Sequence, residues 1–195
     1  MKTIAALLAR QAAHARTPLK RIVVPVSRRL KQSPTQTYKL ITVKYFGRGV
    51  ALRSELSGAE VKGNNWFQVA ADDLIFSKID ARNGAFGIVP AELDGAIVSN
   101  EFPTFTVDVE QASPRFLVTV LSSQPFYSQV ESIVAGATRR RRLEPEQFLE
   151  MSLPLPDLKT QQRVAAEIDM NQATMRRAAD ELERLRTEVN RVWET

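Results

Sequence analysis

The sequence has 195 residues, of which 44% are hydrophobic, so it suits one ordinary domain with an extension and excludes a globally disordered chain. Cysteine is absent and His14 is the single histidine, which excludes a disulfide scaffold, cysteine-ligated zinc, thiol catalysis and a histidine-based triad. The net charge is +5 and every charged residue before Glu55 is basic, which indicates a polyanionic partner, most simply nucleic acid, unless these charges are spread over several faces.

Residues 1–19 are basic, rich in alanine and free of acidic side chains. Ile4, Leu7 and Leu8 lie on one side of a helical projection, so we expect a short amphipathic helix or a flexible extension. An organelle transit peptide has a similar composition and is the alternative. No apolar run approaches the roughly 20 residues that a membrane span needs, and the absence of cysteine fits a cytoplasmic protein.

The next part of the chain is rich in predicted strands. Pro25 interrupts an apolar, β-branched stretch, which predicts an edge strand or a break. Residues 38–46 alternate in the manner of a strand and lead into a turn at Gly47–Gly49. Asn83-Gly84 predicts a two-residue hairpin turn. Further strands are expected within residues 72–80, 95–100 and 104–109.

Helices are predicted from Ser113 onward. Ser113 and Pro114 are typical of an N-cap and a first helical position, and a second helix with Pro125 near its start should stop at Gly136. Residues 144–151 predict one more short turn or helix. Residues 153–158, with the sequence LPLPDL, are expected to break regular structure twice.

The last segment predicts a coiled-coil helix. Apolar residues recur at alternating steps of four and three from Val164 to Val192, so a helix of about 29 residues would span roughly 43 Å. We expect it to leave the globular domain and pack on a partner helix, where Asn171 would fix register or partner number; the alternative is a helix folded back on its own domain. The expected contact residues are Val164, Ile168, Asn171, Met175, Leu182, Leu185 and Val189.

No pattern in the sequence is typical of catalysis. Gly47–Gly49 lacks the spacing of a nucleotide-binding loop, Asp72-Asp73 is better interpreted as a turn than as a metal site, and the Asn-Pro-Pro-aromatic motif of amino-methyltransferases is missing. We therefore expect a non-enzymatic protein without a metal or other cofactor.

Two turns carry candidate nucleic-acid contacts. Lys78, Arg82 and Asn83 surround the predicted hairpin, where Lys and Arg could reach guanine and Asn could pair with adenine; a plain surface turn is the alternative. Lys44 and Arg48 flank the other turn. A further candidate for phosphate contacts is Thr138 with the run Arg139, Arg140, Arg141 and Arg142. Because four adjacent side chains cannot face one surface, one or two of these arginines should pair with Glu144 or Glu146.

The order of these parts resembles a target recognition domain in the specificity subunits of Type I restriction-modification enzymes. The resemblance covers about residues 20–190 and is carried by Gly136, Arg139–Leu143, Phe148-Leu149, residues 154–158 (PLPDL) and Gln161. The family often has Glu where this chain has Thr160, which leaves Gln161 as the residue for the start of the helix. Full specificity subunits usually carry two such domains and two long helices, so this chain resembles a half-subunit.

The resemblance implies an α+β fold with one target recognition domain, built from a twisted mixed β-sheet and peripheral helices and followed by a long coiled-coil helix. The expected divisions are residues 1–19, 20–157 and 158–195. The implied partners are double-stranded DNA, a methyltransferase (modification) subunit, a restriction subunit, and a second half-subunit, identical or different. The implied location is the cytoplasm of a bacterium or archaeon.

The implied role is to read one half of a bipartite DNA target and to space two recognition domains through the helix. A coiled-coil protein-interaction module with solvated arginines is the alternative. An RNA-binding protein is a weaker one, because aromatic residues make up only 7% of the chain and are not clustered.

Overall fold

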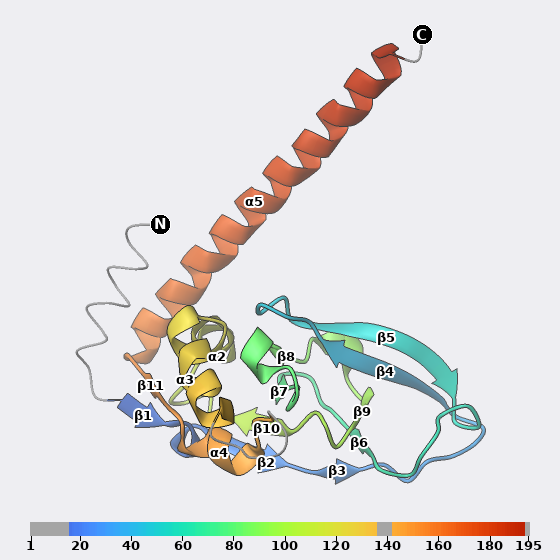
Figure 1. Cartoon of the computed structure of the whole chain (residues 1–195), viewed down its shortest axis with the longest axis vertical. Helices are drawn as coiled ribbons and strands as arrows, with labels where there is room; N and C mark the ends of the chain where they lie inside the picture. Colours follow the sequence, from blue (N-terminus) through green and yellow to red (C-terminus); the bar gives the residue numbers. More distant parts are fainter. Residues whose placement is uncertain (1–15, 136–141, 194–195) are drawn as a thin grey trace.

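The structure, a computed structural model, describes residues 16–135 and 142–193, and Figure 1 shows the arrangement. The strands are β1 (Arg16–Pro18), β2 (Val23–Val26), β3 (Arg28–Arg29), β4 (Thr37–Val43), β5 (Val50–Ser57), β6 (Trp66–Gln68), β7 (Leu74–Phe76), β8 (Phe86–Ile88), β9 (Ile97–Ser99), β10 (Thr104–Val107) and β11 (Ser152–Pro154). The helices are α2 (Pro114–Leu121), α3 (Gln124–Ala135), α4 (Pro145–Glu150) and α5 (Leu158–Trp193), with short 3-10 turns η1 (Leu19–Arg21), η2 (Ala81–Asn83) and η3 (Ala91–Leu93).

The described strands divide into three sheets rather than the single sheet expected. One sheet has the order β2-β10-β7-β8, a second has the order β3-β6-β9-β4-β5, and β1 pairs with β11. The second sheet is mixed, because β4 pairs in parallel with β9 and in antiparallel with β5. Helices α2, α3 and α4 pack beside the first sheet, and α5 projects from the globular part as a rod (Figure 1). The predicted α+β class with a long C-terminal helix is confirmed.

The break around Pro25 is explained by a change of sheet. Pro25 lies in β2, an edge strand of the first sheet, and is in register with Phe105 of β10. An edge strand tolerates the missing N–H of proline because one of its two sides needs no ladder partner. After Ser27 the chain enters β3, which belongs to the second sheet. Of the two predicted alternatives, the edge position is the one confirmed at Pro25, and the strand ends at Val26, before Ser27.

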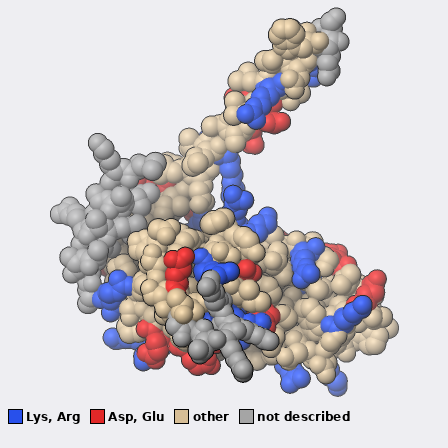
Figure 2. Space-filling model, viewed as in Figure 1, with Lys and Arg blue, Asp and Glu red and all other residues tan. Residues whose placement is uncertain are grey.

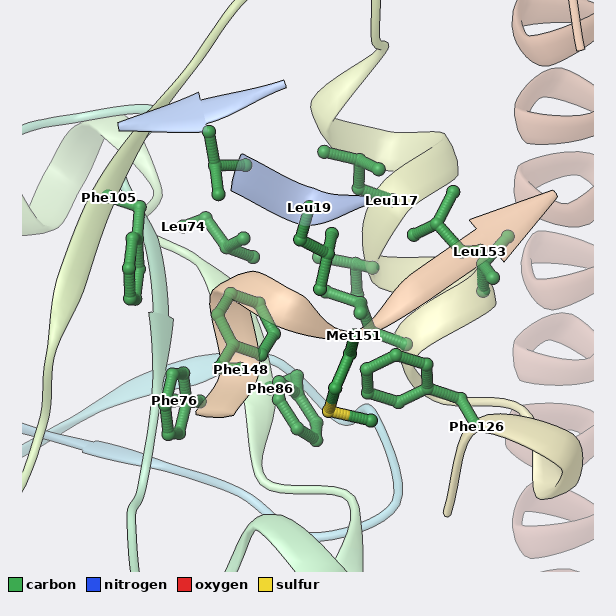
Figure 3. Packing of buried hydrophobic residues seen from close by; sticks show 14 of the residues in the cluster. Leu19, Leu74, Phe76, Phe86, Phe105, Leu117, Phe126, Phe148, Met151 and Leu153 are labelled. Carbon is green, nitrogen blue, oxygen red and sulfur yellow. The ribbon is translucent and has the colours of Figure 1, made fainter. Parts of the chain in front are cut away.

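Phenylalanine rings from strands and helices meet at the centre of the main core (Figure 3). The ring of Phe148, from α4, lies with its centroid 4.8 Å from that of Phe76 and 5.1 Å from that of Phe105. Phe86 of β8 contacts Phe126 of α3 edge-on at 5.6 Å. These contacts fix α3 and α4 against the first sheet, because each fully buried aromatic side chain contributes roughly 1.5–3 kcal/mol by burial.

Local signals in the sequence explain where the short helices begin. The Ser113 hydroxyl accepts the N–H of Phe116 at 3.5 Å, as an N-cap should. The side chain of Gln147 accepts the N–H of Glu144 at 3.1 Å at the start of α4. Helix α3 ends at Ala135, and the predicted stop at Gly136 lies outside the described residues.

The expected break at residues 153–158 is wrong for its first part. Leu153 and Pro154 belong to β11, which pairs with β1 in a two-stranded sheet that places Pro154 opposite Arg16. Proline is accepted here because this ladder is short and has two free edges. The break is confined to the residues between Pro154 and the start of α5 at Leu158.

Helix α5 has 36 residues, and the globular part buries only Gln161, Val164 and Ala165 of it. The Gln161 side chain accepts the N–H of Ser113 at 2.8 Å and donates to the carbonyls of Gln111 at 2.9 Å and Pro156 at 2.7 Å. Arg115 of α2 pairs with Asp169, which lies about one turn beyond Ala165 in α5. The first turns of α5 are therefore anchored on α2, and the rest extends into solvent. Among the described residues, no helix is long and apolar enough to cross a membrane.

Candidate nucleic-acid interface

The two turns that the sequence singled out are joined in the structure. The N–H of Phe46 donates to the carbonyl of Asn83 at 2.9 Å, and the N–H of Gly47 donates to the carbonyl of Gly84 at 3.0 Å. The phenol of Tyr45 donates to Asp80 at 3.3 Å. Residues 44–49, between β4 and β5, and residues 77–85, between β7 and β8, thus form one surface, which we call the turn pair.

The hairpin turn is longer than the two residues predicted from Asn83-Gly84. Strands β7 and β8 do pair in antiparallel, but η2 lies between them and Gly84 follows it with a φ of 71°. The other turn also needs left-handed backbone, at Phe46, Gly47 and Gly49. Two glycines adopt this conformation readily, whereas Phe46 adopts it at a cost in conformational energy.

The corner between α2 and α3 supports both turns from behind. A Cβ added to Gly47 would collide with the hydroxyl of Ser122, and one added to Gly84 would collide with the phenol of Tyr127. Neither hydroxyl completes a hydrogen bond of standard geometry with a described residue. Burial raises the pKa of the Tyr127 phenol, and the nearby Ser122 hydroxyl partly offsets that increase. Sequence reasoning missed these two residues, because nothing in a helical repeat marks a polar side chain that faces a glycine.

The turn pair presents cations that have no ion-pair partner among the described residues. Lys44, Arg48 and Arg82 are exposed, and within residues 16–135 and 142–193 their side chains make no hydrogen bond or ion pair. Asn83 is half-buried beside them, with its backbone holding the neighbouring turn. The structure therefore joins the two turns that carry these residues, but Lys44 and Arg48 line one hollow whereas Arg82 lies beside Glu131 of α3.

Exposed aromatic side chains adjoin these cations. Phe46 is 66% exposed, and its ring lies edge-on to that of Tyr45 with centroids 6.3 Å apart. Both line a hollow of about 380 Å³ whose other lining residues include Lys44, Arg48, Phe102 and the acidic Asp80. An exposed aromatic pair at the tip of a basic turn suits a contact surface, because folding alone would favour its burial.

Lys78 and Arg142 lie in a different setting, where both are ion-paired. The Lys78 ammonium is 3.0 Å from Glu144 and its side chain is only 17% exposed, while Arg142 donates to Glu101 at 2.9 Å. The backbone of Lys78 also accepts the N–H of Leu143 at 3.0 Å. These contacts anchor the chain around Leu143 to the end of β7, so here the two cations hold the protein together.

Arg142 is the one member of the arginine run that the structure describes, so the expected pairing of one or two of these arginines with Glu144 or Glu146 stays a prediction for the others. Arg142 pairs with Glu101, and Glu144 pairs with Lys78. Thr138, Arg139, Arg140 and Arg141 lie outside the described residues. Their role as DNA contacts stays a prediction, as do those of Lys78 and Arg142.

The basic residues of the first third are partly neutralised on other faces. Arg28 makes a bidentate pair with the buried carboxylate of Asp73, at 2.5 and 3.1 Å, and this hydrogen bonding raises the pKa of Arg28. Lys20 pairs with Glu150 at 2.9 Å. The alternative that these charges are spread over several faces is therefore correct for part of them. Asp73 is engaged by Arg28, and no group of described acidic residues or histidines could hold a metal.

The predicted contact stripe of α5 divides into two parts. Val164 is buried and Ile168 packs against the main core, so the alternative of a helix folded on its own domain holds for its base. Asn171, Met175, Leu182, Leu185 and Val189 are all exposed. Met175 also lines a hollow shared with the β4–β5 turn and α2, whereas the described globular part leaves the other four free for a partner.

Comparison with solved structures gives the class to which this fold belongs. The chain matches the HsdS subunit from Thermoanaerobacter tengcongensis with a TM-score of 0.72 and 22% identity over 89% of its length. A structure of a type I R-M system, described by its complex assembly and conformational transition, matches with a TM-score of 0.70 and 23% identity over 90%. The Type-I restriction-modification system S subunit from M. genitalium matches with a TM-score of 0.55 and 11% identity over 91%.

This chain spans 45%, 45% and 44% of those three chains. The sequence itself matches no protein-family model and no curated protein. The fold is that of a Type I specificity subunit. In particular, it corresponds to about half of an HsdS chain, as the sequence resemblance predicted.

Proposed function

We propose that the chain is a DNA-specificity subunit of a Type I restriction-modification system and binds one half of a bipartite duplex target. The observation that carries this proposal is the turn pair, whose exposed cations Lys44, Arg48 and Arg82 make no ion pair with any described residue. Cations at a protruding turn bind phosphates, and Arg and Asn read base edges in the major groove. The fold of HsdS subunits supports the same assignment.

The exposed part of α5 supports a spacing role in this proposal. An antiparallel pair formed by Asn171 to Val189 with an equivalent helix would place two recognition domains at opposite ends and in inverted orientation. Two-fold symmetry in the protein then implies a symmetric target with an unread gap. Methylation and cleavage belong to modification and restriction subunits, and this chain contributes no catalytic residue, metal or other cofactor.

Duplex binding across a range of salt concentrations tests the proposal. We expect the affinity of the wild-type protein for a randomised duplex to fall with salt, with a log–log slope of about −0.9 for each phosphate neutralised. Arg48→Ala and Arg82→Ala should weaken binding and change the sequences recovered from a random duplex library. Arg53→Ala is the matched control, because Arg53 is also exposed but lies in β5 and lines neither hollow beside the turn pair. Salt-insensitive binding, or an equal loss in the control, would contradict the proposal.

The second candidate function is a coiled-coil protein-interaction module, which the exposed stripe on α5 favours. It predicts self-association or partner binding without affinity for duplex DNA. The same titration separates the two functions, because a protein-interaction module would leave a labelled duplex unbound at low salt.

A further inference from the structure

A basic hollow lies between the turn pair and the helix that the proposed function treats only as a spacer. It has a volume of about 420 Å³ and is lined by residues from the β4–β5 turn, β8, α2 and α5. Its lining includes Arg48, Arg115 and Arg176 and contains no acidic residue. Figure 2 shows Lys and Arg side chains in the angle between α5 and the globular part, on the surfaces of both.

The three arginines differ in how they are held. Arg115 donates from Nε to Asp169 at 2.6 Å and from Nη2 to Gln172 at 2.8 Å, which orients its guanidinium. A guanidinium has five N–H donors, so Arg115 retains N–H groups for a ligand even though Asp169 offsets its charge. Gln172 accepts from Arg115 through its oxygen, and its own amide N–H donors remain available.

Arg48 and Arg176 carry the uncompensated charge of the hollow. Both are exposed, and among the described residues neither side chain has a hydrogen-bond or ion-pair partner. One comes from the turn pair and the other from α5, so they approach the hollow from two separate elements. Two free cations across a gap repel each other unless an anion lies between them.

The chemistry of the lining favours a phosphodiester over other occupants. Guanidinium and amide donors match phosphate oxygens, and Gly49 allows close approach, since a side chain added there would meet only open space. Arg48 belongs to both the hollow and the turn pair, so a duplex bound at the turns is positioned to place its backbone there. An acidic segment of a partner protein would satisfy the same cations but would have no reason to adjoin the turn pair.

We propose that this hollow is a phosphate-binding site for the backbone of duplex DNA, with Arg176 of α5 and Arg48 as the contacts of uncompensated charge and with Arg115, whose charge Asp169 offsets, and Gln172 as further donors. The helix then binds DNA directly, and the duplex passes through the angle between α5 and the globular part. Holding one strand at both elements fixes the angle between the duplex and α5. This inference rests on the proposed DNA binding and adds a contact to it that carries no base readout.

The test compares Arg176→Gln with Arg177→Gln. The two arginines are adjacent and exposed on the same helix, but only Arg176 lines the hollow. Affinity for a randomised duplex is measured by fluorescence anisotropy from low to high salt. We expect Arg176→Gln to reduce the magnitude of the log–log slope by about 0.9 and to weaken binding equally for all sequences, with little change in Arg177→Gln. Arg176→Glu should weaken binding further.

The outcomes separate this site from the proposed function. If the wild-type protein binds no duplex, the proposed function fails and the hollow fails with it. If the wild-type protein binds and Arg48→Ala weakens it, but the Arg176 and Arg177 variants keep equal slopes, only the hollow is overturned. If Arg176→Glu leaves DNA binding intact and instead lowers self-association in light scattering, the hollow is a protein contact and the proposal is also wrong.

Discussion

The phenol of Tyr127 lies directly against the Cα of Gly84, so a helix corner fixes the position of the hairpin turn. The carbonyl of the same glycine accepts the N–H of Gly47 at 3.0 Å, and this hydrogen bond fixes the second turn relative to the first. Ser122 contacts Gly47 in the same manner. The positions of the two turns are thus determined by Ser122 and Tyr127, which lie behind the turns and are not among the candidate contacts.

Substitution of Gly84 should therefore cost more than its backbone conformation alone predicts. Gly84→Ala introduces a Cβ at a φ of 71° and against Tyr127, and we expect about 2–4 kcal/mol of destabilisation together with weaker duplex binding. Gly95→Ala is the control, because Gly95 has a φ of 72° but open space around its Cα, so about 1 kcal/mol is expected. Urea unfolding measures the difference, and equal losses in the two variants would show that the Tyr127 contact is loose.

Removal of the Tyr127 hydroxyl should separate stability from binding. The hydroxyl is buried without a hydrogen bond of standard geometry, so we expect Tyr127→Phe to leave the free energy of unfolding unchanged or to raise it by about 1 kcal/mol. Duplex affinity should fall, because the turn at Gly84 loses the atom that it packs against. A clear loss of stability would instead show that the phenol has a partner.

The same variant should change how stability depends on pH. Burial raises the pKa of the Tyr127 phenol in the folded state. The unfolded protein therefore loses this proton first, at its pKa of about 10, and the free energy of unfolding is unaffected below that pH and falls as the pH rises beyond it. Wild-type protein should lose stability relative to Tyr127→Phe as the pH rises above about 10. Urea unfolding of both proteins between neutral and alkaline pH measures this difference, and parallel curves would contradict the assignment.

The ion pair between Arg28 and Asp73 should contribute substantially to the stability of the folded protein. Asp73 is 2% exposed, accepts two bonds from Arg28 and also accepts the N–H of Ala70 at 2.8 Å. We expect Asp73→Asn to destabilise the protein by about 3 kcal/mol, because it leaves a half-buried guanidinium without its counter-charge. Glu150→Gln, which breaks the exposed pair with Lys20, should cost less than about 1 kcal/mol. Similar losses in both variants would indicate that the Arg28 site is solvated.

Local signals predicted the elements better than they predicted their assembly. Ser113-Pro114 located a helix start, and the heptad repeat located α5, because both depend on residues close in sequence. The division into three sheets depends on contacts such as Pro25 with Phe105, which no local pattern specifies. The turns at Lys44–Arg48 and Arg82–Asn83 were each predicted, but their union through Gly47 and Gly84 was not, since backbone hydrogen bonds carry no sequence signature.

The ion pairs show the same limit for side chains. A run of four arginines suggested pairing with the nearest glutamates, whereas Arg142 pairs with Glu101 from a loop far away in sequence. Lys78 looked like a free turn residue and is held by Glu144. Charge type was readable from the sequence, but the partner of each charge depended on the tertiary fold.

The exposed stripe of α5 should form a helix–helix contact that begins beyond Ile168. Val164 is already buried in the core, and therefore a partner helix can cover only the stripe from Asn171 onward. Leu182→Asp and Leu185→Asp should abolish self-association while leaving the unfolding of the globular part unchanged, because both residues are exposed and distant from it. Glu183→Asp, between them and off the stripe, is the control.

Asn171 provides the more discriminating variant of this contact. A polar residue at an apolar seam position fixes register or partner number at some cost in stability. Asn171→Leu should therefore raise the thermal stability of the assembly and broaden its size distribution in light scattering. A protein that remains monomeric in both forms, alone and with a modification subunit, would contradict the spacing role of α5.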